Sequence, residues 1–529
     1  MDDNGDENFK LYSVNIHNGE QLCLTPFDKV TTQIIDELEN DDNCMLIALN
    51  KRNKQIFDVY KLNIETGEIE LIFENPGNVS AYITDHTGVI RILHTTDGVA
   101  QTYLYRANET DEFKSVIQLN FKDALNLSFF DFDNNLMYAS SNLGRDKQAI
   151  VLIDPATMEE KEVIFSHEEV DVKSISYSKK RKTITSTSFV TWKKFYHFYD
   201  KQVEKQFADI QNQVGEEFEI SIVSTDKDET KYIIRTYSDR SLGCYYLYDV
   251  ADKQLYELAE VSPWIKPENL GEMKAISYTS RDNLKINGYL TIPKGRVAKD
   301  LPIVINPHGG PWHRDTWGYN PEVQFLCNRG YAVFQMNFRG STGYGREFWQ
   351  SSFKEWGKAM QDDITDGVNW LVEEGIANPK KIAIYGGSYG GYATLAGAAF
   401  TPDLYACAID FVGVSNLFSF LETIPPYWKP YLDMMYEMVG HPESDKELLE
   451  SSSPVFHVDK IKCPLMVVQG AKDPRVKQAE SDQIVEALKN RGVDVEYMLK
   501  ENEGHGFRNE ENKFEFYQAM EDFLQKHLC

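Results

Sequence analysis

The sequence lacks several features that mark whole classes of protein. No stretch approaches the roughly 18 unbroken apolar residues of a membrane-spanning helix, and the acidic, polar residues 1–8 are the opposite of a signal peptide. The seven cysteines are scattered and without C-x-x-C spacing, and the histidines lack the spacing of metal ligands. We therefore expect reduced thiols, a cytoplasmic protein, and neither a metal nor another cofactor.

Positive charge is also scarce. Lys and Arg number 55 against 82 Asp and Glu, which gives a formal net charge of −27 spread along the chain. This balance argues against nucleic acid and anionic membranes as partners, although ordinary solubility explains it equally simply. With 529 residues, 42% of them apolar, the chain is long enough for two domains, each with its own core.

Residues 1–262 contain a recurring strand–turn–strand element. Its spacing is about 45 to 50 residues, which predicts a β-propeller with blades of four strands; a β-sandwich would not predict so regular a period. Five complete units fit between about 28 and 262, and the first repeat is partial. We expect the sequence to begin partway through a blade, the alternative being an unusual closure of the ring. The repeats are 11–24, 60–73, 104–116, 152–165 and 247–258, with a degenerate copy near 198–200.

Residues 263–529 follow a different pattern, in which apolar strands alternate with helical segments. This alternation predicts an α/β sheet. The helical segments are expected at 321–329, 359–374, 389–400, 475–490 and 512–526. The strands are expected at 274–279, 286–292, 302–306, 331–336, 381–385, 406–412, 465–469 and 494–499.

A serine framed by glycines follows the fifth of these strands. The segment Gly386-Gly-Ser-Tyr-Gly-Gly391 lies between the apolar run 381–385 and the helix-prone residues 392–400. Strand, G-x-S-x-G and helix in that order form a nucleophile elbow, whose tight turn holds the serine hydroxyl above the sheet edge. Ser388 is therefore the candidate nucleophile. A glycine-rich turn without chemistry fits the same short pattern, so the assignment depends on the remaining catalytic groups.

Two further residues supply those groups in the order of an α/β-hydrolase. Asp473 lies beyond the strand 465–469 and His505 beyond the strand 495–499. A serine hydroxyl is a poor nucleophile until an imidazole accepts its proton, and a carboxylate must fix the tautomer of that imidazole. Taken singly, Asp473 fits a turn residue and His505 a loop histidine. In this order, after these strands, they predict a triad with Ser388.

The oxyanion hole requires backbone N–H groups that point at the developing negative oxygen. One is expected from Tyr389, the residue after the nucleophile. The other is expected from Gly310, because Pro307-His-Gly-Gly-Pro-Trp312 follows the third strand, where lipases carry a glycine loop. His308 competes with His505 for the role of base, and we interpret it as structural.

Five segments together resemble the prolyl oligopeptidase family of serine peptidases. The resemblance covers about 270–529; before residue 262 only the propeller pattern supports it. The paired glycines of the first segment are similar to the acylaminoacyl-peptidase branch, and differ from the dipeptidyl-peptidase IV branch, which has a tyrosine in the equivalent hole. The segments are His308-Gly-Gly-Pro-Trp312, Asn337-Phe-Arg-Gly-Ser-Thr-Gly-Tyr-Gly345, Gly386-Gly-Ser-Tyr-Gly-Gly-Tyr392, Asp473-Pro-Arg-Val476 and Glu503-Gly-His-Gly-Phe507.

The resemblance implies roles for individual residues. Ser388, Asp473 and His505 match the family's triad, and Tyr389 and Gly310 match its oxyanion amides. Arg475 matches an arginine that holds a substrate carbonyl, a task suited to a rigid fork of donors; a solvated cation is the alternative. The family's propeller usually has seven blades and restricts entry to short peptides, and the partial first repeat departs from that pattern.

These expectations converge on a serine peptidase that acts on short peptides, N-acylated ones included, through an acyl-enzyme. A dipeptidyl-peptidase and an esterase could use the same triad, and an interaction protein with a vestigial hydrolase is the alternative that is not an enzyme. The acidic pairs Glu168-Glu169 and Glu216-Glu217 could bind a free amino terminus, although such pairs are more often solvated surface. The preferred residue and the oligomeric state, a homo-oligomer included, stay open.

Overall fold

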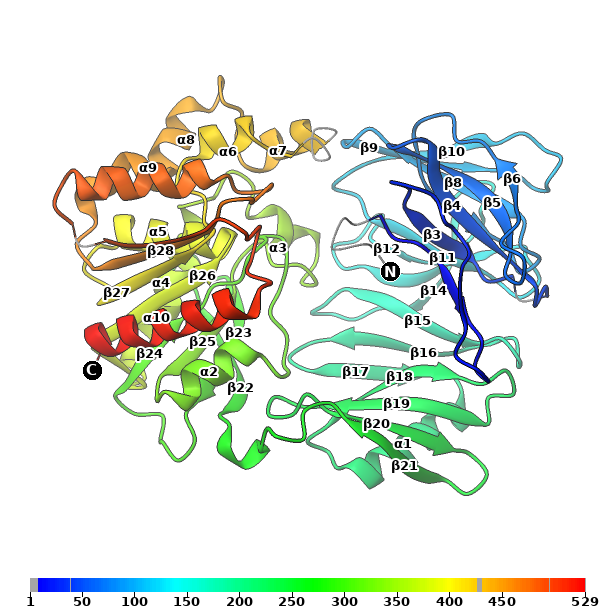
Figure 1. Ribbon diagram of the computed structural model, residues 1–529, viewed down its shortest axis with the longest axis horizontal. Coiled ribbons are helices and arrows are strands. Elements are labelled where there is room, and N and C mark those ends of the chain that lie inside the picture. Colours follow the sequence, from blue (N-terminus) through cyan, green and yellow to red (C-terminus); the bar gives the residue numbers. More distant parts are fainter. Residues whose placement is uncertain (1–7, 39, 426–430, 494, 529) are drawn as a thin grey trace. The chain divides into compact units, whose positions relative to one another are not determined.

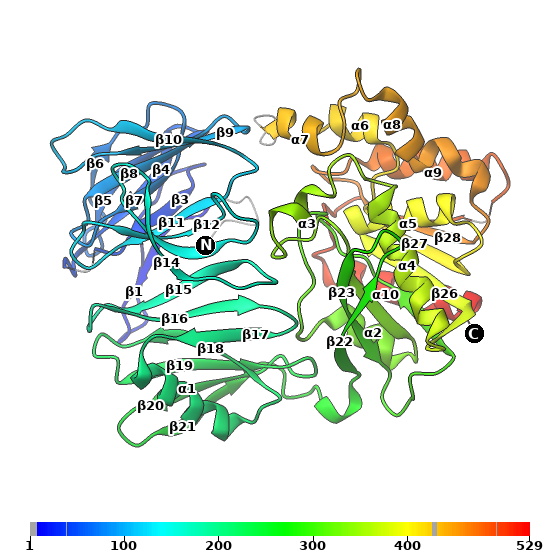
Figure 2. The same cartoon turned by 180° about the vertical axis from the view of Figure 1, so that it is seen from behind.

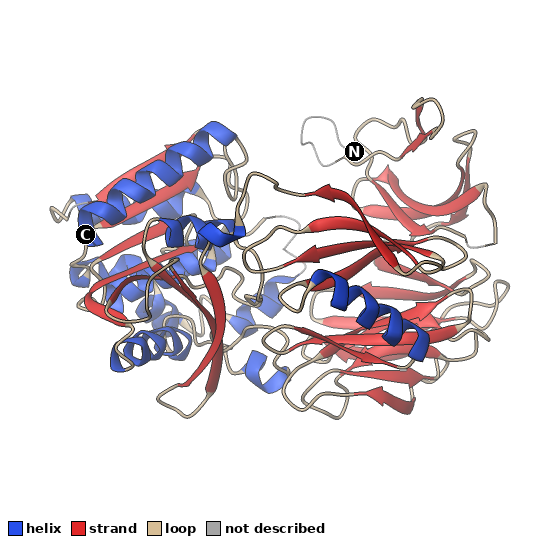
Figure 3. Cartoon of the chain, turned by 90° about the horizontal axis from the view of Figure 1, so that it is seen from below, coloured by secondary structure: helices blue, strands red, loops and turns tan. Residues whose placement is uncertain are grey.

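The computed structural model describes residues 8–38, 40–425, 431–493 and 495–528. Contacts between Cα atoms divide the chain into two compact units, residues 1–166 and 167–529. The first unit and the start of the second consist almost entirely of strands, whereas helices surround the sheet formed by the remaining residues (Figure 3). The expected domain boundary at 262/263 stays a prediction, because the division by contacts falls elsewhere.

The first unit is a series of antiparallel sheets in which each strand pairs with the next along the chain. A two-stranded hairpin precedes three four-stranded sheets. The last two strands of each four-stranded sheet are the strand–turn–strand repeat found in the sequence. The strands are β1 (Tyr12–Val14), β2 (Gln21–Cys23), β3 (Thr32–Asp36), β4 (Cys44–Asn53), β5 (Ile56–Asn63), β6 (Ile69–Phe73), β7 (Val79–Thr84), β8 (Ile90–Thr96), β9 (Ala100–Tyr105), β10 (Lys114–Asn120), β11 (Leu125–Phe130), β12 (Met137–Ser141), β13 (Ala149–Ile153) and β14 (Glu160–Phe165).

The second unit begins with two more sheets of the same kind. The first has three strands, and the helix α1 (Lys201–Val214) stands where a fourth strand was expected. Asp200 starts this helix, because its carboxylate accepts the backbone N–H groups of Gln202 and Val203. The degenerate repeat near 198–200 thus begins at the end of β17, and helix α1 takes the place of its second strand. The strands are β15 (Val172–Ser178), β16 (Thr183–Val190), β17 (Lys194–Phe198), β18 (Glu219–Thr225), β19 (Lys231–Tyr237), β20 (Cys244–Asp249) and β21 (Gln254–Glu260).

The N-terminal part is therefore a five-blade β-propeller arrangement. The prediction of five complete four-stranded units is corrected in one blade, where helix α1 takes the place of a strand. That segment begins with an aspartate cap and continues with the helix-forming residues of 201–214, so local helix propensity prevails over the repeat.

The rest of the second unit is built on one eight-stranded sheet, in which all eight expected strands are present. The strand order is β22-β23-β25-β24-β26-β27-β28-β29, and the pairs from β25 onward are parallel (Figure 1). Parallel neighbours bring the C-terminal ends of these strands to one edge, where catalytic loops gather. The strands are β22 (Glu272–Thr279), β23 (Lys285–Ile292), β24 (Leu301–Ile305), β25 (Ala332–Asn337), β26 (Ala377–Gly387), β27 (Cys407–Phe411), β28 (Leu465–Gly470) and β29 (Val495–Lys500).

Helices cover both faces of this sheet (Figure 2). The helices α4, α5 and α9 share one hydrophobic core with one face, and α2 and α10 share another core with the opposite face. All five were expected. Four short helices and two 3₁₀ turns were not. The elements are α2 (Pro321–Asn328), α3 (Arg346–Gln350), α4 (Ala359–Glu373), α5 (Tyr389–Phe400), α6 (Leu417–Glu422), α7 (Leu432–Met438), α8 (Lys446–Ser452), α9 (Gln478–Lys489), α10 (Glu510–Leu528), and the turns Pro267–Asn269 and Pro454–Lys460.

Two kinds of feature are absent from the described residues. No helix among them is long and apolar enough to cross a membrane. No group of three or more His, Cys, Asp or Glu side chains in the same part of the chain is arranged to hold a metal ion.

Candidate active site

Ser388 occupies a strained turn between β26 and α5. Its backbone angles are φ 60° and ψ −118°, a conformation that residues with a Cβ rarely adopt, and its N–H donates to the carbonyl of Phe411 at 2.9 Å. The flanking glycines are required by close approach. A Cβ atom at Gly386 would lie 2.6 Å from the carbonyl group of Gly390, and one at Gly390 would lie 2.2 Å from the carbonyl oxygen of Pro307. The segment therefore has the geometry of a nucleophile elbow.

Asp473 and His505 meet beyond the ends of β28 and β29. Nδ1 of His505 donates to Oδ2 of Asp473 at 2.7 Å, and the Asp473 carboxylate is fully buried. The other carboxylate oxygen accepts the backbone N–H groups of Arg475 at 2.8 Å and Val476 at 2.9 Å. Because the carboxylate can only accept, the His505 proton stays on Nδ1 and Nε2 is left as a base.

A buried carboxylate also anchors the loop that carries His505. Glu503 accepts the backbone N–H groups of Arg508 at 2.8 Å and Asn509 at 2.9 Å, and the side-chain amide of Asn512 at 2.7 Å. Burial acts to raise the pKa of Glu503, but these hydrogen bonds outweigh it and hold the pKa below its usual value. The loop is thereby held by an ionised group at neutral pH. Glu503 lies in one of the five family-like segments, but no role for it was predicted from the sequence.

The loop expected to supply the second oxyanion amide lies against the elbow. A Cβ atom at Gly309 would be 3.5 Å from Cβ of Ser388. Gly310 has φ +124° and no room for a side chain, since its Cβ would lie 2.8 Å from the N atom of Trp312. Gly310, Tyr389 and Ser388 line the same pocket. Both expected oxyanion residues are thus beside the nucleophile.

His308 is held in a different environment from His505. Its ring stacks on Phe338 at a centroid distance of 4.4 Å, and its nitrogens contact the carbonyl of Gly309 and the hydroxyl of Ser341. Desolvation lowers the pKa of His308 to about 4, so the ring is neutral at neutral pH. His505 lines the pocket together with Ser388, whereas His308 is buried and is not among the described residues that line it. This arrangement supports a structural role for His308.

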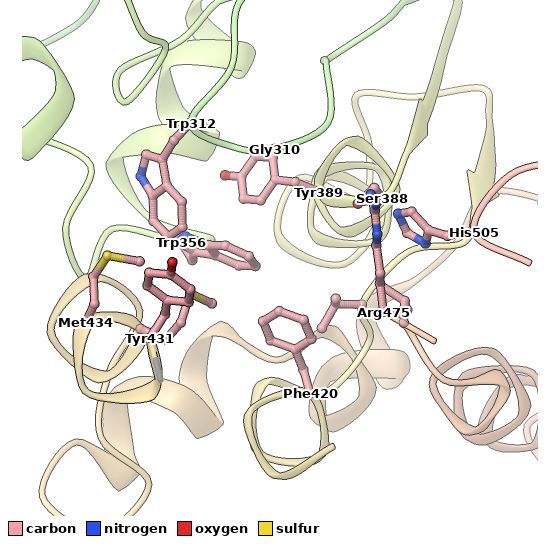
Figure 4. A pocket seen from close by; sticks show the side chains of 13 residues that line it. Gly310, Trp312, Trp356, Ser388, Tyr389, Phe420, Tyr431, Met434, Arg475 and His505 are labelled. Carbon is pink, nitrogen blue, oxygen red and sulfur yellow. The ribbon is translucent and has the colours of Figure 1, made fainter. Parts of the chain in front are cut away.

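The pocket beside Ser388 has a volume of about 370 Å³ and mostly apolar walls. Figure 4 shows Ser388, His505 and Arg475 at one end, and Trp312, Tyr431 and Met434 at the other. Trp356 packs edge-on against Tyr389 at 4.6 Å and continues the aromatic wall. The described residues that line the pocket are Gly310, Trp312, Trp356, Ser388, Tyr389, Val414, Phe420, Tyr431, Met434, Met435, Arg475, Val476 and His505.

Most of this wall was not predicted from the sequence. Tyr389 was expected at the site as a source of an oxyanion amide, and Val414 belongs to the loop after β27. Phe420 lies in α6, Met434 lies in α7, and Tyr431 directly precedes α7. Trp356 comes from a loop before α4. The order of residues along the chain carries no signal for these contacts, because they depend on how short helices pack over the sheet edge.

The acidic pairs considered for binding an amino terminus lie elsewhere. Glu168, Glu169, Glu216 and Glu217 are all exposed, and the carboxylate of Glu169 is 3.5 Å from the ammonium of Lys285. None of the four is among the described residues that line the pocket. Arg475 is among them, and its side chain is exposed.

The chain is similar to known peptidases over its whole length. Residues 317–529 match the model of the prolyl oligopeptidase family. Dipeptidyl aminopeptidase BIII of Pseudoxanthomonas mexicana is 34% identical over 100% of this chain and 78% of its own, and dipeptidyl peptidase family member 6 of Caenorhabditis elegans is 32% identical over 100% and 76%. An acylamino-acid-releasing enzyme of Arabidopsis thaliana is 29% identical over 51% of this chain and 34% of its own.

Solved structures show the same fold. The crystal structure of a puromycin hydrolase superposes with a TM-score of 0.80 at 18% identity, and covers 99% of this chain and 83% of its own. The similarity above 30% identity to relatives that match the whole of this chain, together with the family match, confirms the resemblance drawn from the five motifs. The chain belongs to the prolyl oligopeptidase family and is a serine peptidase.

Proposed function

We propose that this peptidase cleaves short peptides through an acyl-enzyme formed on Ser388. The observation that carries the proposal is the Asp473–His505 hydrogen bond of 2.7 Å on a pocket that Ser388 also lines. A carboxylate that fixes Nδ1–H leaves Nε2 to accept the serine proton, which is the requirement for an activated serine.

Each step of this hydrolysis can be assigned to a residue. His505 takes the proton of Ser388 as the hydroxyl attacks the substrate carbonyl, and the amides of Tyr389 and Gly310 hold the negative oxygen that forms. His505 returns the proton to the leaving amine. A water molecule, activated by the same imidazole, then hydrolyses the ester and restores Ser388. Arg475 binds a carbonyl of the substrate.

The pocket predicts a preference on the acyl side of the cleaved bond. Trp312, Trp356 and Phe420 supply flat apolar walls, while the thioethers of Met434 and Met435 adapt to the shape of the bound group. A volume of about 370 Å³ accommodates an aromatic or large aliphatic side chain. We expect such residues to be preferred over glycine and over charged residues.

The relatives that match the whole chain support a proposal about the length of the released fragment. Both of those named above are dipeptidyl peptidases, whereas the acylamino-acid-releasing enzyme matches about half of this chain. We therefore propose release of dipeptides from a free amino terminus. Release of acylated residues is the second candidate, favoured by the His308-Gly-Gly-Pro segment and by a pocket whose described lining contains no carboxylate to bind an ammonium group.

Matched fluorogenic substrates separate these proposals. Alanyl-phenylalanyl, acetyl-alanyl-phenylalanyl and acetyl-phenylalanyl amides of one coumarin share the same residue at the cleaved bond. Dipeptide release predicts the highest kcat/KM for the first, and release of acylated residues predicts it for the third. Cleavage of esters with no cleavage of amides would refute the peptidase proposal, and turnover by Ser388→Ala would refute the assignment of the nucleophile.

A further inference from the structure

A buried carboxyl group lies directly behind the catalytic elbow. Asp410, near the end of β27, pairs in register with Gly386 of β26 and with Val467 of β28. Its side chain is fully buried. The proposed mechanism assigns it no role, and the sequence analysis did not single it out.

Two glycines make room for this carboxyl group. A Cβ atom at Gly391 would lie 2.4 Å from Oδ1 of Asp410, and one at Gly413 would lie 2.1 Å from the same oxygen. Gly391 is in the first turn of α5, the helix that starts at Ser388, and Gly413 precedes Val414 in the pocket wall. One oxygen thus touches both the nucleophile helix and the loop that shapes the pocket.

The surroundings disfavour a negative charge on Asp410. Neither carboxyl oxygen has a hydrogen-bond partner of normal geometry among the described residues. Desolvation raises the pKa of Asp410 to about 8, the charge of Glu480 adds to this, and the nearby amide of Gly413 opposes it. The group is therefore neutral at pH 7.

The elements around Asp410 bring few other titratable groups. Gly386, Val467, Gly391 and Gly413 carry none. Glu480 of α9 is buried and accepts the backbone N–H groups of Ser415 and Asn416. Tyr497 of β29 is within electrostatic reach, since Asp410 contributes to the raised pKa of its phenol.

We propose that Asp410 is a positioning residue that must stay uncharged for the oxyanion hole to work, which rests on Ser388 being the nucleophile. The neutral carboxyl packs the first turn of α5 against the 411–416 loop. Once ionised, it places a negative charge behind the helix N-terminus whose N–H dipoles stabilise the oxyanion, and it opposes the charge that develops there. Loss of the Asp410 proton then sets the alkaline limit of turnover.

Asp410→Asn tests this directly, because the amide has the same shape and cannot ionise. For the wild type we expect kcat to fall on the order of tenfold or more between pH 7 and pH 9.5. For Asp410→Asn we expect kcat within about threefold of the wild type at pH 7 and no such fall above pH 8. The matched control is Asp403→Asn, which removes an exposed carboxylate paired with Lys462 and should retain the wild-type profile.

Two additions keep the test decisive. Glu480→Gln removes the neighbouring charge that raises the pKa of Asp410, so the alkaline limit of turnover in this variant should move to lower pH. If Asp410→Asn does not fold, Glu480→Gln tests the proposal in its place. The rate of Ser388 labelling by a fluorophosphonate, followed over the same pH range, reports on the oxyanion hole without a peptide substrate. Failure to label Ser388 in the wild type would refute the proposed function, and with it the basis of this inference.

Normal labelling with identical pH profiles for the wild type and Asp410→Asn would overturn the role of Asp410 alone. A folded but inactive Asp410→Asn at pH 7 would also overturn it, because a neutral isostere should suffice. An unshifted alkaline limit in Glu480→Gln would count equally against it.

Discussion

Replacement of Asp473 by asparagine isolates the role of one hydrogen bond. Oδ1 of Asp473 accepts two backbone N–H groups, those of Arg475 and Val476, and only an oxygen can take that place. The asparagine oxygen must therefore stay on the backbone, and its amide nitrogen must face Nδ1 of His505. The amide then donates to Nδ1, the ring proton moves to Nε2, and the imidazole can no longer accept the proton of Ser388.

The expected loss in kcat is about 10⁴-fold, which corresponds to about 5 kcal/mol of transition-state stabilisation. The fold should survive, since shape and backbone hydrogen bonds are retained. Asp473→Ala makes a contrasting control. It also removes the acceptor of the two backbone N–H groups, at a cost on the order of 1–3 kcal/mol for each one that water cannot reach. We expect its melting temperature to fall below that of Asp473→Asn.

The assay is kcat and KM on a dipeptidyl coumarin amide, together with thermal unfolding of both variants. Asp473→Asn should lose turnover and fluorophosphonate labelling together while its melting temperature stays near that of the wild type. A kcat of Asp473→Asn within tenfold of the wild type would refute the proposal that Asp473 fixes the tautomer of His505. Equal destabilisation of the asparagine and alanine variants would refute the assignment of the backbone hydrogen bonds.

Three further outcomes are expected. Ser388→Ala should abolish turnover and labelling without loss of the folded circular dichroism spectrum, and residual turnover would point to another nucleophile. His308→Ala should mainly reduce stability. The pKa of His308 is about 4 in the folded protein and 6.5 in the unfolded chain, so protonation of His308 should lower the wild-type free energy of unfolding by roughly 3 kcal/mol as the pH drops from 6.5 to 4. Denaturant titrations of the variant should lack this contribution. A folded His308→Ala as inactive as Ser388→Ala would instead make His308 the base. Arg475→Lys should raise KM for dipeptidyl substrates with little change in kcat, because an ammonium lacks the fork of donors of a guanidinium. An unchanged KM would show that Arg475 is a solvated cation that does not bind the substrate.

Much of the fold could be read from local patterns. The eight strands of the sheet were all expected, and the six that pair in parallel are short continuous apolar runs bounded by loops, as buried parallel strands usually are. The repeat in the first half predicted the propeller for a similar reason, since each blade reuses the same alternation of strands and turns. The exception is α1, where an aspartate cap and a helix-forming stretch replace a strand inside the repeat.

The candidate triad could also be predicted, because its members follow strands whose ends meet at one sheet edge. The walls of the pocket could not. Trp356, Phe420 and Tyr431 reach it from short helices and loops, and their placement depends on packing against residues far away in the chain.

The amino-acid sequence by itself determined the succession of strands and helices along the chain, the glycine spacing of the elbow and the identity of the groups expected at the site, because each of these follows from a few neighbouring residues. Only the tertiary structure decided which histidine is buried and neutral, which side chains shape the pocket, and that the carboxyl group of Asp410 lies behind the elbow with no hydrogen-bond partner among the described residues. Those properties arise from desolvation and packing between distant segments, and neither is encoded in any one stretch of the chain.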